Sequence, residues 1–263
     1  MSNKILLLGA GGYIGRYLSG VFDTIPITRK ECDLTDRSSV ENMLKKHRPD
    51  VILNCAANLN LELGSFNHNH FADNLNIFLN LYGLRDNFKK LINFGSGAEF
   101  DRKKPIHNAL EKDIRIIKPT DHYGLSKNII ANICMDTPNF YTLRLFGCLH
   151  HSESSNKLFK RLSTTNQPIV IDDKYFDYIW LEDLYPIVKH FVNSSPAVKD
   201  INLVYGKKFL LSELLNKFIT LHNLDVEVIY KAGGLNYTGS SLLIDSFNFP
   251  LTGIELALEK YSI

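Results

Sequence analysis

Tyr123 and Lys127 form the clearest candidate pair for acid–base chemistry in this chain. They are four residues apart, so a helix would place both side chains on one face. A free tyrosine titrates near pH ~10, and proton transfer near neutral pH requires a pKa shift of roughly 3 units, or ~4 kcal/mol. A nearby ammonium supplies part of that shift because it favours the phenolate. The pair therefore predicts a tyrosine that exchanges a proton with a bound molecule.

The same spacing recurs at Tyr185 and Lys189, and position separates the two pairs. Tyr123 lies one predicted helix before a predicted sheet strand, whereas Tyr185 precedes a proline at the start of a late helix. We therefore expect the chemistry at Tyr123 and interpret the Tyr185 pair as coincidental.

Ser96 could act together with Tyr123. It follows the apolar run 91–94 through one glycine, which places it at the carboxyl edge of a predicted strand. There its hydroxyl could hydrogen-bond a substrate carbonyl that Tyr123 protonates. A serine that caps a loop is the alternative, and the presence of Tyr123 and Lys127 favours the functional interpretation.

Residues 5–15 predict a buried strand that runs into a glycine-rich turn and then a helix. Gly9, Gly12 and Gly15 match Gly-x-x-Gly-x-x-Gly, although Ile14 occupies the last glycine position of Gly-x-Gly-x-x-Gly. Such a turn presents backbone N–H groups at a helix N-terminus, where a pyrophosphate can bind. A tight turn without a ligand is the alternative, and the position at the start of the chain favours a dinucleotide site.

The end of the second predicted strand indicates which dinucleotide binds. In NAD sites an acid at this place holds the ribose hydroxyls, whereas NADP sites carry positive charge for the extra phosphate. Arg29 and Lys30 precede the first acid here, so the sequence favours NADP(H). NAD(H) is the alternative if Glu31 binds the ribose. Asp33, in a segment that could cap the next helix, could also contact the adenine.

Short apolar runs alternate with amphipathic segments through the first half of the chain, the pattern of a parallel sheet with helices on both faces. We predict an α/β fold, a Rossmann-like doubly wound parallel sheet with a small C-terminal substrate-binding region. The NADP-binding core would span 1–147 and the mainly substrate-binding region 148–263, with segments at about 178–205 returning to the core. The predicted strands are 5–8, 25–28, 51–55, 91–94, 140–145, 169–171, 178–181, 201–205 and 226–230, and the predicted helices are 13–22, 37–47, 67–88, 122–135, 154–163, 182–193 and 209–221.

The composition argues against several classes of protein. Of the 263 residues, 44% are apolar, and 30 basic residues against 28 acidic ones leave no field that would attract nucleic acid or a membrane surface. We interpret the run Arg102-Lys103-Lys104 as a solvated loop. The four cysteines lack metal-site spacing, and the histidine pairs at 68/70 and 150/151 have no third ligand nearby, so we expect no metal. No apolar run is long enough to span a membrane, so we expect a soluble cytoplasmic protein.

Together these motifs resemble the extended branch of the short-chain dehydrogenase/reductase (SDR) family, the epimerase/dehydratase group that processes nucleotide-activated sugars with NAD(P). Asn74 and Asn80 also resemble a helix signature of that family, Asn-x-x-x-x-x-Asn. The resemblance covers most of the chain. The matching segments are 9–15, 33–36, 49–57, 95–96, 123–127, 143–147 and 177–184.

The resemblance implies a role for each candidate. Tyr123 would be the acid/base, and Lys127 would hold the nicotinamide ribose and tune Tyr123. Ser96 would bind the reacting oxygen, and Asn74 would support Lys127. Residues 28–36 look most like the NADP-using GDP-fucose synthases, where an arginine at the place of Arg29 meets the 2′-phosphate. The implied cofactor contacts are Gly9, Gly12, Tyr13, Ile14, Gly15, Arg29, Lys30, Asp33, Leu34, Ala56, Ala57, Asn74, Tyr123 and Lys127.

Two departures from the family narrow the reaction. Sugar-nucleotide 4,6-dehydratases carry Asp-Glu directly after the catalytic hydroxyl residue, where this chain has Gly97-Ala98. GDP-fucose synthases use a cysteine at the place of Ala98 and a histidine near Lys157 for epimerisation. Since neither pair is present, hydride transfer with a tyrosine proton remains, unless a one-residue shift in the loop brings Glu99 inward.

We therefore predict an oxidoreductase of nucleotide-sugar and deoxysugar biosynthesis. Its reaction would be the NADPH-dependent reduction of the C4 ketone of a nucleotide-linked 4-keto-6-deoxyhexose. An NAD-dependent nucleotide-sugar 4-epimerase is the alternative, because it needs the same serine, tyrosine and lysine. A non-catalytic dinucleotide-binding regulator is a lesser alternative.

Substrate contacts are predicted at two places. Ser96, Gly97 and Ala98 would lie at the sugar, and Lys157 and Arg161 could bind phosphates. Lys160 shares their predicted helix, for which a solvated charged face is the alternative.

A third departure is Phe176, where the family often has an arginine near the substrate diphosphate. Relatives often form homodimers through the helices that correspond to 67–88 and 122–135. The apolar residues of these segments could instead all belong to the core of one chain.

Overall fold

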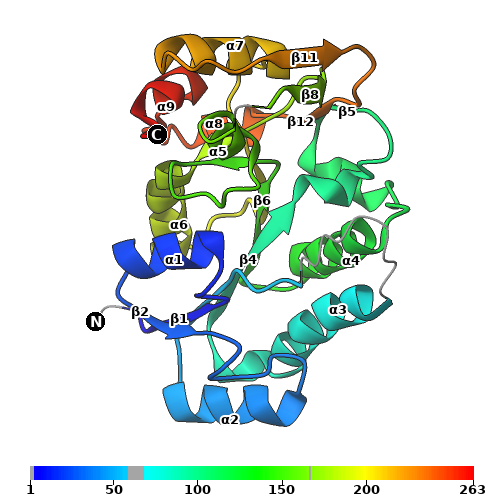
Figure 1. Cartoon of the computed structure of the whole chain (residues 1–263). Coiled ribbons are helices and arrows are strands. Elements are labelled where there is room, and N and C mark those ends of the chain that lie inside the picture. The colour runs from blue at the N-terminus through cyan, green and yellow to red at the C-terminus, as the bar shows by residue number, and fades with distance from the viewer. Residues whose placement is uncertain (1–2, 59–67, 166) are drawn as a thin grey trace.

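The structure, a computed structural model, describes residues 3–58, 68–165 and 167–263. Its centre is a parallel sheet of six strands in the order β10-β6-β4-β3-β1-β2 (Figure 1). The chain runs from β1 to β2 on one side and then crosses to β3 on the other side of β1. This confirms the predicted α/β doubly wound fold. The strands are β1 Ile5–Leu8, β2 Thr24–Ile27, β3 Val51–Asn54, β4 Lys90–Ser96, β6 Phe140–Leu145 and β10 Asp200–Leu203.

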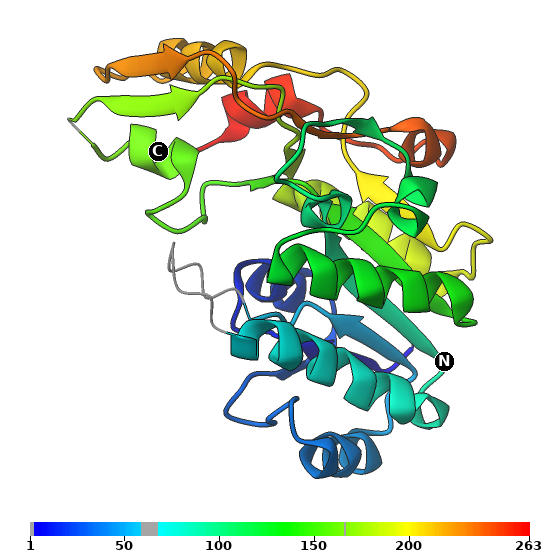
Figure 2. The ribbon, with the colours of Figure 1, turned by 90° about the vertical axis from the view of Figure 1, so that its right-hand side faces the viewer.

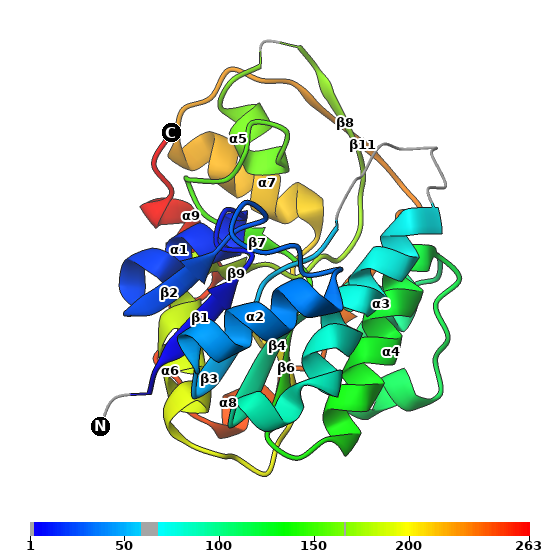
Figure 3. The ribbon, with the colours of Figure 1, turned by 90° about the horizontal axis from the view of Figure 1, so that it is seen from below.

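Helices cover both faces of the sheet, because the central strands bury both sets of their alternating side chains. Leu7 and Leu53 lie in one apolar core, which α1 and α6 cover. Leu6 and Ile52 lie in the opposite core, against α2, α3 and α4 (Figure 3). The covering helices are α1 Tyr13–Val21, α2 Arg37–His47, α3 His68–Gly83, α4 His122–Asp136 and α6 Leu184–Asn193.

The second half of the chain forms short strand pairs and small helices at the end of the molecule opposite α2 (Figure 2). Here the sequence was less informative. The predicted helix 154–163 is shortened to α5, and the pair β5–β12 and the helices α8 and α9 were not predicted. The remaining strands are β5 Ile106–Ala109, β7 Cys148–Leu149, β8 Ile169–Asp172, β9 Ile179–Trp180, β11 Val228–Lys231 and β12 Tyr237–Gly239. The remaining α-helices are α5 Leu158–Leu162, α7 Leu211–Leu221, α8 Leu242–Ser246 and α9 Ile254–Lys260. The 3-10 helices are η1 Arg85–Asn87, η2 Gly97–Phe100, η3 Glu111–Arg115 and η4 Leu181–Asp183.

A fully buried arginine joins the end of β4 to the neighbouring strands. The Nε of Arg144, on β6, lies 2.5 Å from Oε2 of Glu99 in η2, and its Nη2 lies 2.6 Å from Oδ2 of Asp200 on β10. Its Nη1 donates to Oδ1 of Asn202 at 2.9 Å. Burial raises the pKa of both carboxyls, and the guanidinium opposes the shift. The contacts tie η2, β6 and β10 together.

The turn between β1 and α1 requires glycine at two positions. Gly9 has a φ of +75°, and a Cβ there would lie 2.7 Å from the backbone nitrogen of Ala56, at the end of β3. A Cβ at Gly15 would lie 2.2 Å from the carbonyl oxygen of Gly9. Gly12 is the N-cap of α1 and brings no side chain to that helix end. The turn therefore packs closely against both β3 and the first turn of α1.

We expect Gly15→Ala to destabilise the fold, because the added methyl group would meet a backbone oxygen that cannot rotate away. Overpacking of this kind costs about 1–3 kcal/mol. Gly20→Ala is the matched control: Gly20 lies on the same helix, and a Cβ there would meet no atom within 4 Å. Urea unfolding should give a lower midpoint for Gly15→Ala and an unchanged or higher one for Gly20→Ala. Equal midpoints for the two variants would contradict the close packing of the turn.

Candidate active site

A cleft of about 1150 Å³ lies at the carboxyl ends of the central strands. Its wall runs from the glycine turn after β1, past the ends of β2, β3, β4 and β6, to residues 233–237 in the second half of the chain. Doubly wound sheets bind ligands at this edge, where the strand order reverses. The volume exceeds the roughly 300–1000 Å³ of ordinary small-molecule sites, so the cleft has room for two ligands side by side.

The glycine turn forms one end of the cleft. Gly9, Gly12 and Gly15 line it together with Tyr13 and Ile14. Because Gly9 and Gly12 carry no side chains ahead of α1, the first N–H groups of that helix can approach a ligand closely. This cradle fits the pyrophosphate of a dinucleotide. Ala56 and Ala57, which follow β3, also belong to the wall.

Of the two neighbouring cations in the segment after β2, one faces the cleft and the other does not. Arg29 lines the cleft with Asp33 and Leu34, whereas Lys30 lies outside the wall. Glu31, the alternative ribose ligand, instead accepts a hydrogen bond from the backbone nitrogen of Thr28 at 2.8 Å and another from its hydroxyl. The positive charge that this segment offers to the cleft near the predicted ribose position is thus the guanidinium of Arg29.

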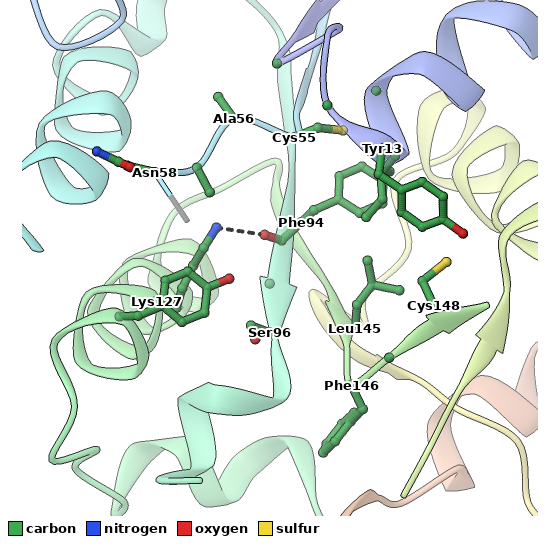
Figure 4. A pocket seen from close by; sticks show the side chains of 18 of the residues that line it. Tyr13, Cys55, Ala56, Asn58, Phe94, Ser96, Lys127, Leu145, Phe146 and Cys148 are labelled. Atoms are coloured by element: carbon green, nitrogen blue, oxygen red, sulfur yellow. Dashed lines mark hydrogen bonds between the residues drawn. The ribbon is translucent and has the colours of Figure 1, made fainter. Parts of the chain in front are cut away.

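Ser96, Tyr123 and Lys127 come together in the same wall. Ser96 ends β4, and the other two lie on the first turns of α4. That helix begins where Oδ1 of Asp121 accepts the N–H of Gly124 at 2.9 Å. Nζ of Lys127, which burial desolvates, donates to the carbonyl oxygen of Phe94 at 3.1 Å (Figure 4). Burial lowers the pKa of Lys127.

The structure shifts the pKa of Tyr123 upward, opposite to the downward shift expected from the sequence, so the phenol holds its proton firmly. Burial raises the pKa of its phenol to about 12, against opposing contributions from a hydrogen bond with Ser96 and from the charge of Arg102. The guanidinium carbon of Arg102 lies 5.6 Å from the centroid of the Tyr123 ring, and Nη2 pairs with Oδ1 of Asp121 at 3.0 Å. Arg102 is exposed in a turn, as expected for a solvated loop, and it also lines the cleft. Its neighbours Lys103 and Lys104 are exposed.

The turn after Ser96 is fixed by reciprocal hydrogen bonds. Oγ of Ser96 accepts the N–H of Ala98 at 3.2 Å, and Oε1 of Glu99 accepts the N–H of Ser96 at 2.8 Å. Glu99 is fully buried against Arg144, so it is not available to the cleft as a base. Gly97 and Ala98 are buried as well and lie outside the wall. Among the described residues of this turn, Ser96 alone reaches the cleft.

Asn74, expected to support Lys127, forms hydrogen bonds with the loop after β3. Oδ1 of Asn74 accepts the N–H of Asn58 at 2.8 Å, and its amide donates to the carbonyl of Asn58 at 3.1 Å. Asn74 therefore holds the loop after β3 and lies outside the cleft wall. Asn80 holds another loop, because its amide donates to the carbonyls of Leu34 and Thr35 at 3.0 Å each. The expectation that Asn74 supports Lys127 stays a prediction.

The far end of the cleft is built by the second half of the chain. Lys157 lines it, whereas Arg161 and Lys160 do not. Phe176 lies in the wall with Lys174, whose Nζ is 5.6 Å from the centroid of the phenylalanine ring.

Tyr237 also belongs to this wall. Sequence reasoning missed Lys174 and Tyr237, because both stand in irregular segments without a periodic or spacing signal.

The histidine pair at 150/151 packs away from this site. The ring of His150 lies 3.8 Å from that of His151 and 4.8 Å from that of Trp180, centroid to centroid. In the described part of the chain, no group of three or more His, Cys, Asp or Glu residues is arranged to hold a metal ion. None of the helices described here is long and apolar enough to cross a membrane.

Comparisons with known proteins agree with this geometry. The chain is 26% identical over 202 residues to a dTDP-4-keto-6-deoxy-D-glucose reductase from Streptomyces niveus, covering 70% of this chain and 67% of that protein. It is 27% identical over 245 residues to a GDP-L-colitose synthase from Yersinia pseudotuberculosis, covering 80% and 79%.

Solved structures show the same fold. The dTDP-4-dehydrorhamnose reductase of Bacillus anthracis in complex with NADP matches with a TM-score of 0.81 and 16% identity, covering 99% of this chain and 98% of that one. The GDP-mannoheptose C4 reductase of Campylobacter jejuni with NADP bound matches with a TM-score of 0.79 and 18% identity, covering 98% of each chain. Residues 5–148 match the model of the NAD dependent epimerase/dehydratase family, and the chain belongs to that family, as its motifs predicted.

Proposed function

We propose that this protein is an NADPH-dependent reductase of the C4 ketone of a nucleotide-linked 4-keto-6-deoxyhexose. The observation that carries the proposal is the convergence of Ser96, Tyr123 and Lys127 on one cleft wall beside the glycine turn. The turn after Ser96 offers the cleft no further proton-transfer group, because Glu99 is buried in an ion pair. A reduction needs none, whereas an elimination does. One similar protein is itself named as the reductase of a dTDP-4-keto-6-deoxy sugar.

The residues around the glycine turn support a bound dinucleotide. The N-terminal N–H groups of α1 would hold the pyrophosphate beside Gly9 and Gly15. Arg29 would pair with a 2′-phosphate, and Lys127 would hold the nicotinamide ribose. NADPH, when bound, supplies a hydride.

Ser96 and Tyr123 would complete the reduction at the ketone. The hydroxyl of Ser96 would donate a hydrogen bond to the carbonyl oxygen and hold it beside the phenol. Tyr123, which is protonated at neutral pH like any free tyrosine and whose pKa burial raises further to about 12, would give its proton to that oxygen as negative charge develops there. One hydride on carbon and one proton on oxygen convert the ketone to an alcohol. The phenolate that remains would lie near the charge of Arg102.

Two cations at the far end of the cleft would bind the substrate diphosphate. Lys157 and Lys174 both line this end, and neither forms an ion pair with a described residue. Lys174 lies next to Phe176, which stands where the family often has an arginine. We infer that Lys174 supplies the charge that Phe176 cannot.

A second copy of this chain is the remaining predicted partner. Leu79 on α3 is 41% exposed, whereas Phe78 and Leu81 of the same helix are buried within the chain. An apolar contact between α3 and a second copy of the chain would cover Leu79. Light scattering, which measures the oligomeric state, would test this contact. The cytoplasmic location expected from the sequence stays a prediction.

We expect Tyr123→Phe to abolish turnover while NADPH binding persists, because the change removes one hydroxyl and keeps the ring. General acid catalysis contributes about 10²- to 10⁴-fold, so the rate should fall by that factor. The assay supplies NADPH with several freshly made 4-keto-6-deoxy nucleotide sugars and follows both the absorbance of the reduced nicotinamide and the stereochemistry of the product.

Tyr185→Phe is the matched control for this variant. Tyr185 has the same spacing to a lysine but lies on the outer part of α6, 36% exposed and outside the cleft wall. Its loss should leave the rate unchanged. Full activity of Tyr123→Phe would refute the mechanism, and interconversion of sugar epimers without consumption of NADPH would favour the 4-epimerase instead.

We expect Arg29→Ala to weaken NADPH binding about 10- to 100-fold, because a charge-assisted contact is worth about 1.5–3 kcal/mol. NADH, which lacks the extra phosphate, should bind almost unchanged. Lys30→Ala is the control, since this neighbour carries the same charge outside the wall. Titration calorimetry with both nucleotides measures the effect. Equal losses for NADPH and NADH would contradict the assignment of the 2′-phosphate to Arg29.

A further inference from the structure

A second tyrosine lies beside Ser96, from a distant part of the chain. Tyr237 begins β12, where its N–H donates to the carbonyl of Tyr175 at 2.8 Å and its own carbonyl accepts the N–H of Asp177 at 3.1 Å. β12 also pairs in parallel with β5. The backbone of Tyr237 is therefore held on two sides, which fixes the direction in which its side chain enters the cleft wall.

The ring of Tyr237 is packed so that its hydroxyl end approaches the turn after β4. It meets the ring of Phe146 edge-on at 5.1 Å and stacks on that of Phe176 at 5.2 Å, between centroids. A Cβ on Gly97 would lie only 2.8 Å from Cζ, the carbon that carries the phenol oxygen. Gly97 directly follows Ser96, so the phenol lies over the peptide next to the serine. The absence of a side chain at Gly97 is what leaves room for it.

Ser96 thus shares the cleft wall with two phenols, those of Tyr123 and Tyr237. Burial, the larger cause, raises the pKa of both Tyr123 and Tyr237, and interaction with the hydroxyl of Ser96 opposes that rise. Both phenols therefore keep their protons at neutral pH and can donate. Arg102 is close enough to favour the charged form of either ring.

A serine hydroxyl has one hydrogen to donate and two lone pairs that accept. One acceptor position of Ser96 is already filled by the N–H of Ala98. If the O–H of Tyr237 fills the other, the single hydrogen of Ser96 has to point in the remaining direction. In the proposed complex, the oxygen of the ketone would lie in that direction, in the cleft that Ser96 and Tyr123 line together.

We propose that Tyr237 is a positioning residue, whose phenol donates to Oγ of Ser96 and thereby directs the hydrogen of Ser96 toward the reacting oxygen. The kinetic part of this proposal rests on the reductase function proposed above. The packing that brings the phenol of Tyr237 to the peptide next to Ser96 does not, because it is present in the protein without ligands.

The kinetic test uses Tyr237→Phe, which keeps the packing against Phe146 and Phe176 and removes only the hydroxyl. We expect kcat for a nucleotide-sugar ketone to fall about 3- to 10-fold, the size of one neutral hydrogen bond, with KM nearly unchanged. In a Ser96→Ala background, the same change should cause no further loss, because Tyr237 acts through the serine. A loss of the same size in both backgrounds, or a change in KM alone, would overturn the proposal.

Tyr178→Phe is the matched control. The Tyr178 ring packs on the same Phe176 ring at 4.7 Å, yet it lies outside the cleft wall. Removing its hydroxyl should leave kcat unchanged in both backgrounds. A loss equal to that of Tyr237→Phe would show that the aromatic packing, and not the hydrogen bond, is responsible.

A spectroscopic test needs neither substrate nor cofactor. In protein labelled with ¹³C at the ζ carbon of tyrosine, the Tyr123, Tyr178 and Tyr237 signals are assigned from the corresponding phenylalanine variants. Ser96→Ala should move the signals of Tyr237 and Tyr123 and leave that of Tyr178 in place. An unmoved Tyr237 signal would refute the contact. If that signal moves but the wild-type protein reduces no nucleotide-sugar ketone, the proposed function fails while the contact is supported.

Discussion

One buried guanidinium fixes the turn that carries Ser96. Arg144 has no exposed surface and lies between the carboxylates of Glu99 and Asp200. Taking such charges out of water is costly, and removing one partner of a buried set costs about 3–5 kcal/mol. Because Glu99 also accepts the N–H of Ser96, the position of the serine depends on this set of charges. The same contacts keep Glu99 out of the cleft.

The buried charges of Arg144, Glu99 and Asp200 also show why the first half of the chain does not complete the site by itself. The family model matches residues 5–148, which include Ser96, Tyr123 and Lys127. Asp200, however, lies on β10, which joins the main sheet beside β6. The far wall of the cleft likewise comes from later segments around 174–176 and 233–237. The wall around Ser96 is therefore completed only when both halves have folded.

Burial controls the protonation of the central side chains. The phenol of Tyr123 is desolvated and stays neutral well above physiological pH, the form that a proton donor requires. The ammonium of Lys127 donates to the carbonyl of Phe94, and Arg102 brings positive charge to the ring of Tyr123. The sequence suggested one cation beside the tyrosine, and the fold provides another from a loop.

The sequence by itself determined the regular elements of the first half of the chain. Alternation of apolar runs and amphipathic segments predicted the doubly wound sheet, and the glycine spacing predicted the turn between β1 and α1. The four-residue spacing of Tyr123 and Lys127 placed both on one side of α4, and both indeed line the cleft. These features depend on neighbours within a few turns of the chain, so a local pattern is enough to reveal them.

Only the tertiary structure decided which side chains reach the cleft from irregular segments. It brought Arg29 into the wall and left Lys30 outside, and it turned Arg102 toward Tyr123. It also placed Tyr237 beside Ser96, although no spacing links the two in sequence. In a loop, the direction of a side chain follows from a few backbone angles and from packing against distant residues. Neither leaves a periodic signal in the sequence, so these placements appear only once the chain is folded.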